Sequence, residues 1–545
     1  MNFKKYIRVL AALLITGSLH AELPNATNND PYPLYSSVYP YSYLATRQKA
    51  YLQRFEYAYP VDRFRISISG FGQFANRARD SERNVINIGD INGRWNMLAL
   101  FYDPPLRTQL FNILRIPANL ATDKRICFAN ITDPRKIDPN KEFGFFTIPG
   151  WYRKYGARFE SELLLIDKCF YSVGIKVQFG IADVRQTVMR FDDLTCQALG
   201  IACPATGCAE DPANSCKAGA PPNPPPFPDP TPITPPFTDP NFQAPCPPTS
   251  AACLGPSFPA APKECITLPQ AFVPCADATC CLSFDCDCKQ LVIENIMKQR
   301  DKIADFLGLD ICNYHKIGVE DVRIDLFWRE IFVINEESEV YPRLLFMPFA
   351  ELGFGIPMEK AKPVNKPFAV PIGNNGHASL SGKFGFTFDF LDTIDLSFVG
   401  GFSYFFKQDY CNFRLPTHPQ ESGIFPYTAD VTIRPGPTWF FAAGMHAFHF
   451  LDNLSVWAEY VLTSHAQDKI QVCRSFIPST SNYFKTGFDV ERAECFTKWE
   501  SHLFNIGFNY DLSDHLSAGI AFQIPVRQRN AYVSSMVLGT LTFVY

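Results

Sequence analysis

Cysteine is the residue type that could do the most chemistry in this sequence. Thirteen of the 18 cysteines lie between residues 196 and 312. The tight group from Cys275 to Cys288 contains no pair with the two-residue gap of a usual zinc knuckle, and no histidine. We therefore predict disulfide bonds and no bound metal. The disulfide candidates are Cys196, Cys203, Cys208, Cys216, Cys246, Cys253, Cys265, Cys275, Cys280, Cys281, Cys286, Cys288 and Cys312.

Disulfides require an oxidising compartment, and the N-terminus predicts export to one. Lys4, Lys5 and Arg8 form a basic region, residues 9–16 are apolar, and a Leu-His-Ala sequence precedes Glu22. This pattern is typical of a secretory signal peptide over residues 1–21. Residues 22–60 are rich in Tyr, Pro and Asn, and two interpretations of this N-terminal segment stay open, an ordered periplasmic segment or a loose tail.

Catalytic chemistry has little support in the sequence. It has no Gly-x-Ser-x-Gly elbow, phosphate-cradling loop or zincin helix. Five of the nine histidines are scattered over the last hundred residues of the chain: His446, His449, His465, His502 and His515. We therefore expect no enzyme activity and no cofactor. The net charge of -4 gives no reason to expect a nucleic-acid partner.

Charged residues of both signs recur at alternate positions in segments that are otherwise apolar. Two interpretations stay open. Either the charges pair across neighbouring strands and solvate an inner wall, or some of them line a constriction and tune the selectivity of a pore. The pore-lining candidates are Arg63, Arg65, Arg158, Glu160, Glu162, Lys176, Asp321, Arg323, Asp325, Arg329, Arg343, Glu351, Lys383 and Asp389.

The elements that would position these charges are β-strands. In residues 383–390, four phenylalanines alternate with Lys383, Gly385, Thr387 and Asp389, so one face is apolar and the other polar or small. Aromatic residues make up 14% of the chain and charged residues 19%, and the mean hydropathy is -0.07. After the signal, no run of 18 apolar residues appears. This composition is typical of a membrane β-barrel and not of a helical membrane protein.

The connections between these strands indicate a closed antiparallel barrel. Short turns that contain Asp lie at 166–168, 391–393, 451–453 and 512–515. The long connections, at 185–319, 357–376, 408–436 and 466–497, all fall at the opposite end. We predict an all-β fold, a transmembrane antiparallel β-barrel of about 14 strands, with 12 and 16 as alternatives. That number includes a first strand near residues 64–74, a second at 97–101 and one more between 107 and 148.

The longest connection is an insert at residues 184–319, which separates barrel segments 61–183 and 320–545. It holds nearly half of the 45 prolines, and proline cannot donate to a strand ladder, so the insert cannot form barrel wall. By its position it lies on the extracellular side, either as a surface loop or folded back into the lumen as a plug. Apolar residues at helical spacing predict one helix within it, from about 287 to 308.

The C-terminal strand has an aromatic last residue and alternating apolar positions before it. The residues on that face are Val537, Gly539, Leu541, Phe543 and Tyr545. This pattern resembles the C-terminal signature of Gram-negative outer-membrane β-barrel proteins of the porin-like kind. The resemblance covers roughly residues 62–183 and 320–545. It implies location in the cell outer membrane, contact with outer-membrane lipid, and recognition of this face by the barrel-assembly machinery.

The resulting hypothesis is a porin-like channel for passive diffusion of small hydrophilic solutes or ions, with homo-oligomerisation left open. In one alternative the barrel only anchors a cysteine-rich adhesin or a disulfide-cross-linked envelope protein, whose insert binds an envelope or host-surface partner. The cysteine content is similar in composition to that of the cysteine-rich major outer-membrane proteins of chlamydia-like bacteria. In a second alternative the barrel is plugged and transports hydrophobic substrates.

Overall fold

The computed structural model describes most of the predicted barrel and part of its connections. The described residues are 64–101, 106, 109–110, 113, 145–168, 171–194, 299–335, 344–390, 394–417, 421–451, 453–475, 487–513 and 515–544. The predicted signal peptide, the segment 22–60 and most of the cysteine- and proline-rich insert lie outside them.

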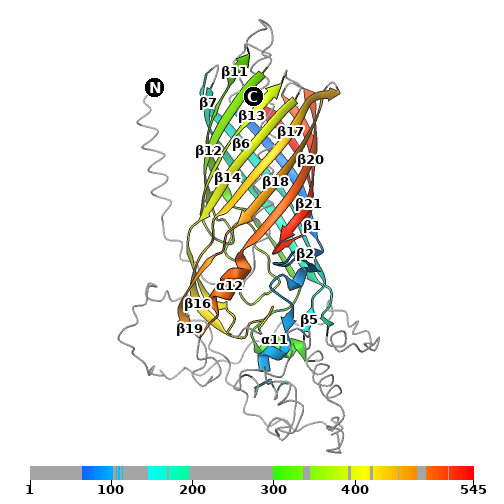
Figure 1. Cartoon of the computed structure of the whole chain (residues 1–545), viewed down its shortest axis with the longest axis vertical. Coiled ribbons are helices and arrows are strands. Elements are labelled where there is room, and N and C mark those ends of the chain that lie inside the picture. Colours follow the sequence, from blue (N-terminus) through cyan, green and yellow to red (C-terminus); the bar gives the residue numbers. More distant parts are fainter. Residues whose placement is uncertain are drawn as a thin grey trace, which may run out of the picture.

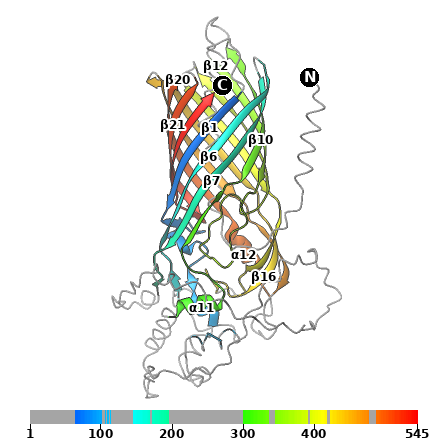
Figure 2. The same cartoon turned by 180° about the vertical axis from the view of Figure 1, so that it is seen from behind.

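Twelve long strands form a closed antiparallel barrel (Figures 1 and 2). Each strand pairs with the next along the chain, and the last pairs with the first to close the wall. The strands are β1 (Phe64–Ala75), β6 (Gly150–Asp167), β7 (Tyr171–Val188), β10 (Val322–Glu330), β12 (Leu344–Ile356), β13 (Ser379–Phe390), β14 (Ile394–Phe405), β17 (Thr438–Leu451), β18 (Leu454–His465), β20 (Trp499–Ser513), β21 (Leu516–Arg529) and β23 (Ser535–Val544). β9 (Tyr314–Val319) pairs with β7, and β11 (Phe332–Asn335) pairs with β12, so both lengthen the wall beside β10.

The all-β barrel class is confirmed, and the number of wall strands lies at the lower end of the predicted range. The predicted strand at Met97–Phe101 is wrong: these residues form a 3-10 helix, η3. Its sequence is a continuous apolar run without alternation, and Met97 and Leu100 are buried in an apolar cluster outside the wall. The strand expected between 107 and 148 falls mostly outside the described residues; within the described part, β5 (Phe145–Thr147) is a strand of a separate small sheet and not of the wall.

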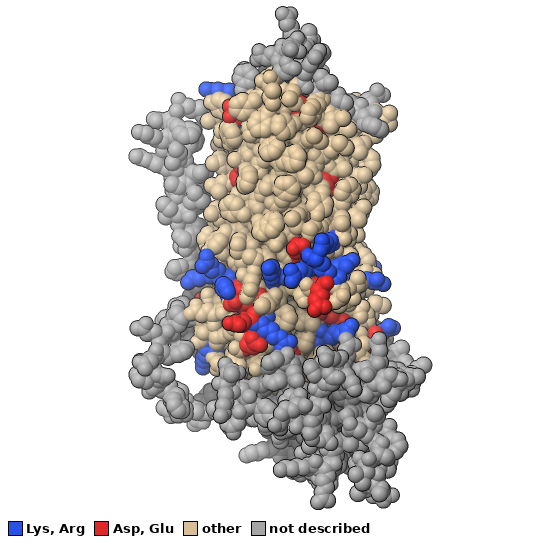
Figure 3. Space-filling view, viewed as in Figure 1, with Lys and Arg blue, Asp and Glu red and all other residues tan. Residues whose placement is uncertain are grey.

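The outer face of the barrel is a wide apolar belt. Side chains such as Phe384, Phe402 and Trp439 point outward and are 63%, 48% and 45% exposed. On the face seen in Figure 3 this belt is almost free of charge, and a band of Lys and Arg together with Asp and Glu lies below it, towards the long loops. A strand of 12 residues such as β13, tilted by about 45°, spans roughly 28 Å, which matches the hydrocarbon core of a bilayer. The belt is therefore the membrane-facing surface.

The long connections fold into a compact layer at one end of the barrel, the loop end. This layer contains three small sheets: β2 (Arg77–Arg79), β3 (Val85–Asn87) and β22 (Ala531–Tyr532); β4 (Trp95–Asn96), β5 and β8 (Asp192–Asp193); and β15 (Gln408–Arg414), β16 (Thr428–Arg434) and β19 (Lys469–Ser475). It also contains η2 (Ile88–Asp90), η3, α11 (Arg300–Phe306) and α12 (Val490–Thr497). Among the described residues, no helix is long and apolar enough to cross a membrane.

Helix α11 is the described part of the helix predicted over 287–308, and the remainder lies outside the described residues. Ile303, Ala304 and Leu307 are buried in a cluster with Trp95 and Phe368, which fixes α11 to the loop end of the barrel. Of the thirteen disulfide candidates, only Cys312 lies among the described residues, and it is disulfide-bonded there. The pairing of the other twelve stays a prediction.

Candidate functional site: the charged lumen

The inner face of the barrel carries most of the charges singled out from the sequence. Eleven of the fourteen pore-lining candidates are buried on this face: Arg65, Arg158, Glu160, Glu162, Lys176, Arg323, Asp325, Arg329, Glu351, Lys383 and Asp389. Asp321 lies in the link between β9 and β10 and is half-buried, and its Oδ2 accepts a hydrogen bond from the Asn374 N–H at 2.7 Å. Arg63 and Arg343 lie outside the described residues. That these side chains line a conducting pore stays a prediction.

The strand register places four of these charges side by side. Arg65 on β1 is directly opposite Glu162 on β6, Glu162 is opposite Lys176 on β7, and Lys176 is opposite Asp325 on β10. Directly opposite residues in an antiparallel sheet are close enough for their side chains to interact. The row therefore alternates in sign across four neighbouring strands of the inner wall.

Two lysines on different strands share one carboxylate in the lumen. The Nζ of Lys176 lies 3.0 Å, and that of Lys383 2.7 Å, from Oε2 of Glu351. Beside them, the Arg323 Nε donates to Asp325 Oδ1 at 2.7 Å. All five side chains are less than a tenth exposed, so the contacts are sheltered from water and from screening by salt.

A second pair holds β10 to β6 nearer the short-turn end. The Arg329 guanidinium donates two hydrogen bonds to Glu162, at 2.6 Å to Oε1 and 3.1 Å to Oε2. Such bidentate pairs are among the strongest side-chain contacts. The same guanidinium lies 4.1 Å from the centre of the Phe327 ring, which also faces inward. Both oxygens of Glu162 are thus occupied by Arg329.

A third cluster lies nearer the loop end and includes residues that the sequence reasoning missed. Glu320 contacts both Lys154 Nζ and Arg158 Nε at 2.7 Å. Lys154 has the same parity along its strand as Arg158, Glu160 and Glu162, so strict period-two spacing could have identified it. Asp395 and Glu459 are also buried on the inner face and were missed, although they too alternate with outward residues.

An apolar layer also crosses part of the lumen. Phe349, Val399, Ala442, Val461 and Leu503 face inward from β12, β14, β17, β18 and β20 and form one buried cluster. Together with the ion pairs they fill the inside of the described barrel. The lumen is therefore packed with side chains and is not a wide water-filled bore.

The connection between β12 and β13, residues 357–378, folds across the loop end of the lumen. Its Val370 and Ile372 belong to one buried cluster with Phe71 of β1 and Trp457 of β18, which come from different sides of the wall. Ion pairs hold it at two places: Lys316–Glu359 at 2.6 Å and Lys366–Asp310 at 2.7 Å. We call residues 357–378 the mouth segment.

The mouth segment is also held by a buried histidine outside the membrane-facing belt. The His377 Nδ1 donates to the Phe406 carbonyl oxygen at 2.9 Å, so its Nε2 is the acceptor for the Tyr410 hydroxyl. Burial lowers the pKa of His377 to about 4. The ring is therefore neutral at ordinary pH.

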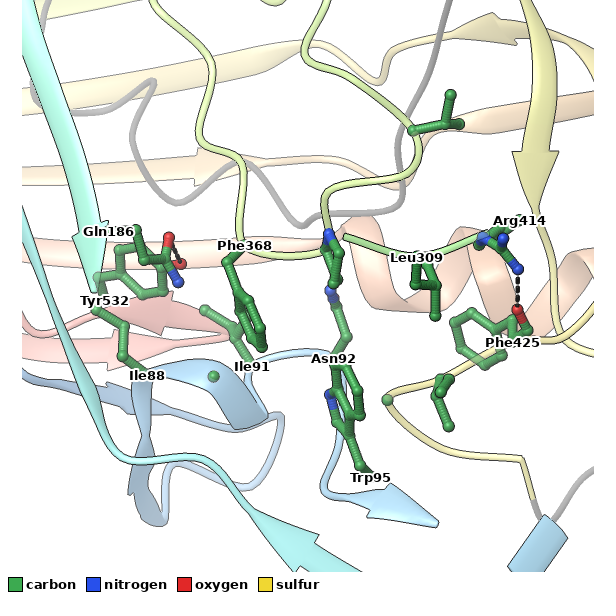
Figure 4. A pocket seen from close by; sticks show the side chains of 15 residues that line it. Ile88, Ile91, Asn92, Trp95, Gln186, Leu309, Phe368, Arg414, Phe425 and Tyr532 are labelled. Carbon is green, nitrogen blue, oxygen red and sulfur yellow. Dashed lines mark hydrogen bonds between the residues drawn. The ribbon is translucent and has the colours of Figure 1, made fainter. Parts of the chain in front are cut away.

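Below the mouth segment, a small pocket lies between the barrel and the loop layer (Figure 4). The Phe368 ring of the mouth segment stacks on Trp95 with their centroids 5.7 Å apart. On one side Arg414 Nη1 donates to the Phe425 carbonyl oxygen at 2.8 Å, and on the other Tyr532 donates to Gln186 at 3.4 Å. The polar groups are thus bonded within the protein, and the pocket mainly marks where the mouth segment rests on the loop layer.

The closed antiparallel wall, the apolar outer belt and the polar inner face together define a transmembrane β-barrel, and the protein is located in the outer membrane. Its sequence matches no family model and no curated protein. Solved structures similar to it include an outer-membrane channel from Pseudomonas putida F1, with 6% identity, a TM-score of 0.40, and coverage of 89% of this chain and 97% of that one.

Two further solved structures are similar to this chain. The toluene transporter TodX of Pseudomonas putida has 6% identity and a TM-score of 0.27, with 91% of each chain covered. A FadL homologue of Pseudomonas aeruginosa has 10% identity and a TM-score of 0.28, with 96% of this chain and 95% of that one covered.

Proposed function

We propose that the protein is a narrow outer-membrane channel for small hydrophilic solutes or ions, closed in this structure by its own side chains and by the mouth segment. The observation that carries the proposal is the inner wall, where cations and carboxylates from β1, β6, β7, β10, β12 and β13 face one another. Paired charges of both signs are a feature of selective pores and are not needed to anchor a barrel.

The size of the barrel fits a narrow path. Barrels of about eight strands are filled by their own side chains, whereas those of 16 to 18 strands leave an aqueous channel. Twelve strands lie between these limits. Small displacements of the mouth segment and of the lumen side chains therefore decide whether a continuous path exists.

A polar lumen also favours hydrophilic over hydrophobic substrates. A hydrophobic molecule passing Glu351, Lys176 and Lys383 would remove buried charges from their polar surroundings without offering them a partner, which is costly. Apolar side chains also face inward, in the cluster around Phe349 and in the cluster of Phe71 and Trp457. Binding of detergent or fatty acid inside the purified barrel would favour the hydrophobic alternative.

Conductance in planar lipid bilayers tests the proposal. We expect wild-type protein to give small, brief conductance steps, and the Lys366→Met variant, which loses the ion pair to Asp310, to stay open longer. Lys469→Met is the matched control, because it also removes a loop-end lysine from a single ion pair but lies outside the mouth segment. Complete absence of steps from folded wild-type and Lys366→Met protein would refute the proposal.

A further inference from the structure

Arg65 is the described lumen cation that takes part in none of the ion pairs given above. It faces inward from β1 and is 7% exposed. Its Nε and Nη1 are buried and have no hydrogen-bond partner. A buried guanidinium that lacks hydrogen bonds is costly, because it has lost its water without a replacement.

Glu162 and Glu160 attract the charge of Arg65, but the described ion pairs of the carboxylates around it are with other cations. Glu162, directly opposite, gives both oxygens to Arg329. Asp325 accepts from Arg323, and Glu351 is shared by Lys176 and Lys383. The remaining carboxylate, Glu160, is opposite Ser67, one inward position further along β1.

Arg65 differs from the other described arginines of the inner face. Arg158 donates to Glu320, Arg323 to Asp325 and Arg329 to Glu162. The Arg65 guanidinium donates to none of the described carboxylates. An oxyanion from outside the chain would supply the missing acceptor.

Arg65 lies close to an entrance. It is the second residue of β1, and it is paired with Val544, the last residue of β23, so it lies at the short-turn end of the wall. This is the end opposite the mouth segment. A small anion entering there meets Arg65 early on its path into the lumen.

We propose that Arg65 binds a small oxyanion, such as a carboxylate or phosphate group, and makes the lumen selective for anions. The planar guanidinium fork matches the paired oxygens of these groups, and Arg329 beside it adds positive potential. The selectivity rests on the proposed channel function, whereas the binding site does not.

Anion binding is measured on full-length protein in detergent, as the increase in thermal unfolding temperature with inorganic phosphate at constant ionic strength. We expect phosphate to stabilise wild-type protein and to bind Arg65→Gln at least about tenfold more weakly, the loss expected for hydrogen bonds to a charged group. Arg65→Lys keeps the charge without the fork and should bind with intermediate affinity. Arg153→Gln, which removes an exposed arginine of the outer surface, should bind like wild type.

The outcomes separate the site from the channel. Equal stabilisation of wild type, Arg65→Gln and Arg65→Lys, or no stabilisation of any of them, overturns the site. In bilayers with a tenfold salt gradient, the reversal potential should indicate anion preference in wild type and in Arg153→Gln, and a reduced preference in Arg65→Gln. Absence of any conductance would refute the proposed function but would leave a phosphate effect that depends on Arg65 standing.

Discussion

Replacing Glu351 by glutamine should strongly destabilise the barrel, because this carboxylate neutralises two buried lysines. Glu351→Gln keeps the size of the side chain and removes only its charge. Oε2 lies 3.0 Å from Lys176 Nζ and 2.7 Å from Lys383 Nζ. At an effective dielectric constant of about 20, each contact is worth about 6 kcal/mol of Coulomb attraction before the cost of desolvation is subtracted.

Most of that attraction is offset by the cost of removing the three groups from water. The measured loss when one partner of a buried ion pair is removed is about 3–5 kcal/mol, and we expect a value in this range for Glu351→Gln. A second change should relieve it: in Glu351→Gln with Lys383→Met, one of the two orphaned cations is gone, so at least half of the lost stability should return. Lys469→Met removes an exposed lysine from Glu494, which keeps its hydrogen bonds from Gln467 and Ile470, so this change should cost less than about 1 kcal/mol.

Urea-induced unfolding in lipid vesicles, followed by the fluorescence of the 6 tryptophans, measures these free energies. A loss of less than about 1 kcal/mol for Glu351→Gln would contradict the reasoning, since it would mean that water or counter-ions already compensate these lysines. A double variant less stable than Glu351→Gln alone would contradict it as well, because Lys383 would then contribute by its packing and not by its charge.

Three further predictions concern other parts of the molecule. Phe384→Arg, on the outer belt, should lower stability in lipid by about 2–4 kcal/mol, whereas Phe384→Leu should have little effect. Unfolding in vesicles measures both, and equal effects would mean that this face is not in hydrocarbon. Burial lowers the pKa of His377 to about 4, so the folded state binds fewer protons than the unfolded state between pH 6.5 and 4. The mouth segment should therefore lose up to about 3 kcal/mol of stability as the pH falls through this range. Hydrogen exchange of residues 357–378 measures this loss, which His377→Gln should abolish; a pH-independent wild type would contradict it. Deletion of residues 196–298, which spares α11, should leave folding and conductance intact; lost conductance would mean that the insert is part of the pore. If the insert forms cross-links, non-reducing gels of envelopes should show a ladder with the full chain and none with the deletion variant.

The wall of the barrel was predictable because its signal is local. In β13 and β14 every second residue is apolar, and this period alone fixes both the strand and the face that each side chain takes. The same parity puts Lys176, Glu351 and Lys383 on the polar face of their strands, and all three are buried in the structure. Only the exact ends of the turns and the pairing of the last strand with the first could not be predicted from this local period.

The loop layer was not predictable, because its pairings join distant and very short segments. Arg77–Arg79 pairs with Ala531–Tyr532, more than 400 residues away, and neither segment is long enough to show a period. The choice of ion-pair partner is similarly non-local: Glu162 is opposite Arg65 in the register, yet it is held by Arg329 from β10. Sequence spacing gives the face of a charge but not which opposite charge reaches it.

The mouth segment is continuous at both ends with wall strands, β12 and β13. The segment cannot leave the barrel as a separate plug domain could. The lumen can therefore open only if the segment moves while both of its ends stay attached to the wall. Its return is intramolecular and first order, with a rate that does not depend on how many copies share the membrane. Each molecule would therefore open and reseal on its own, and a sparse population would behave like a crowded one.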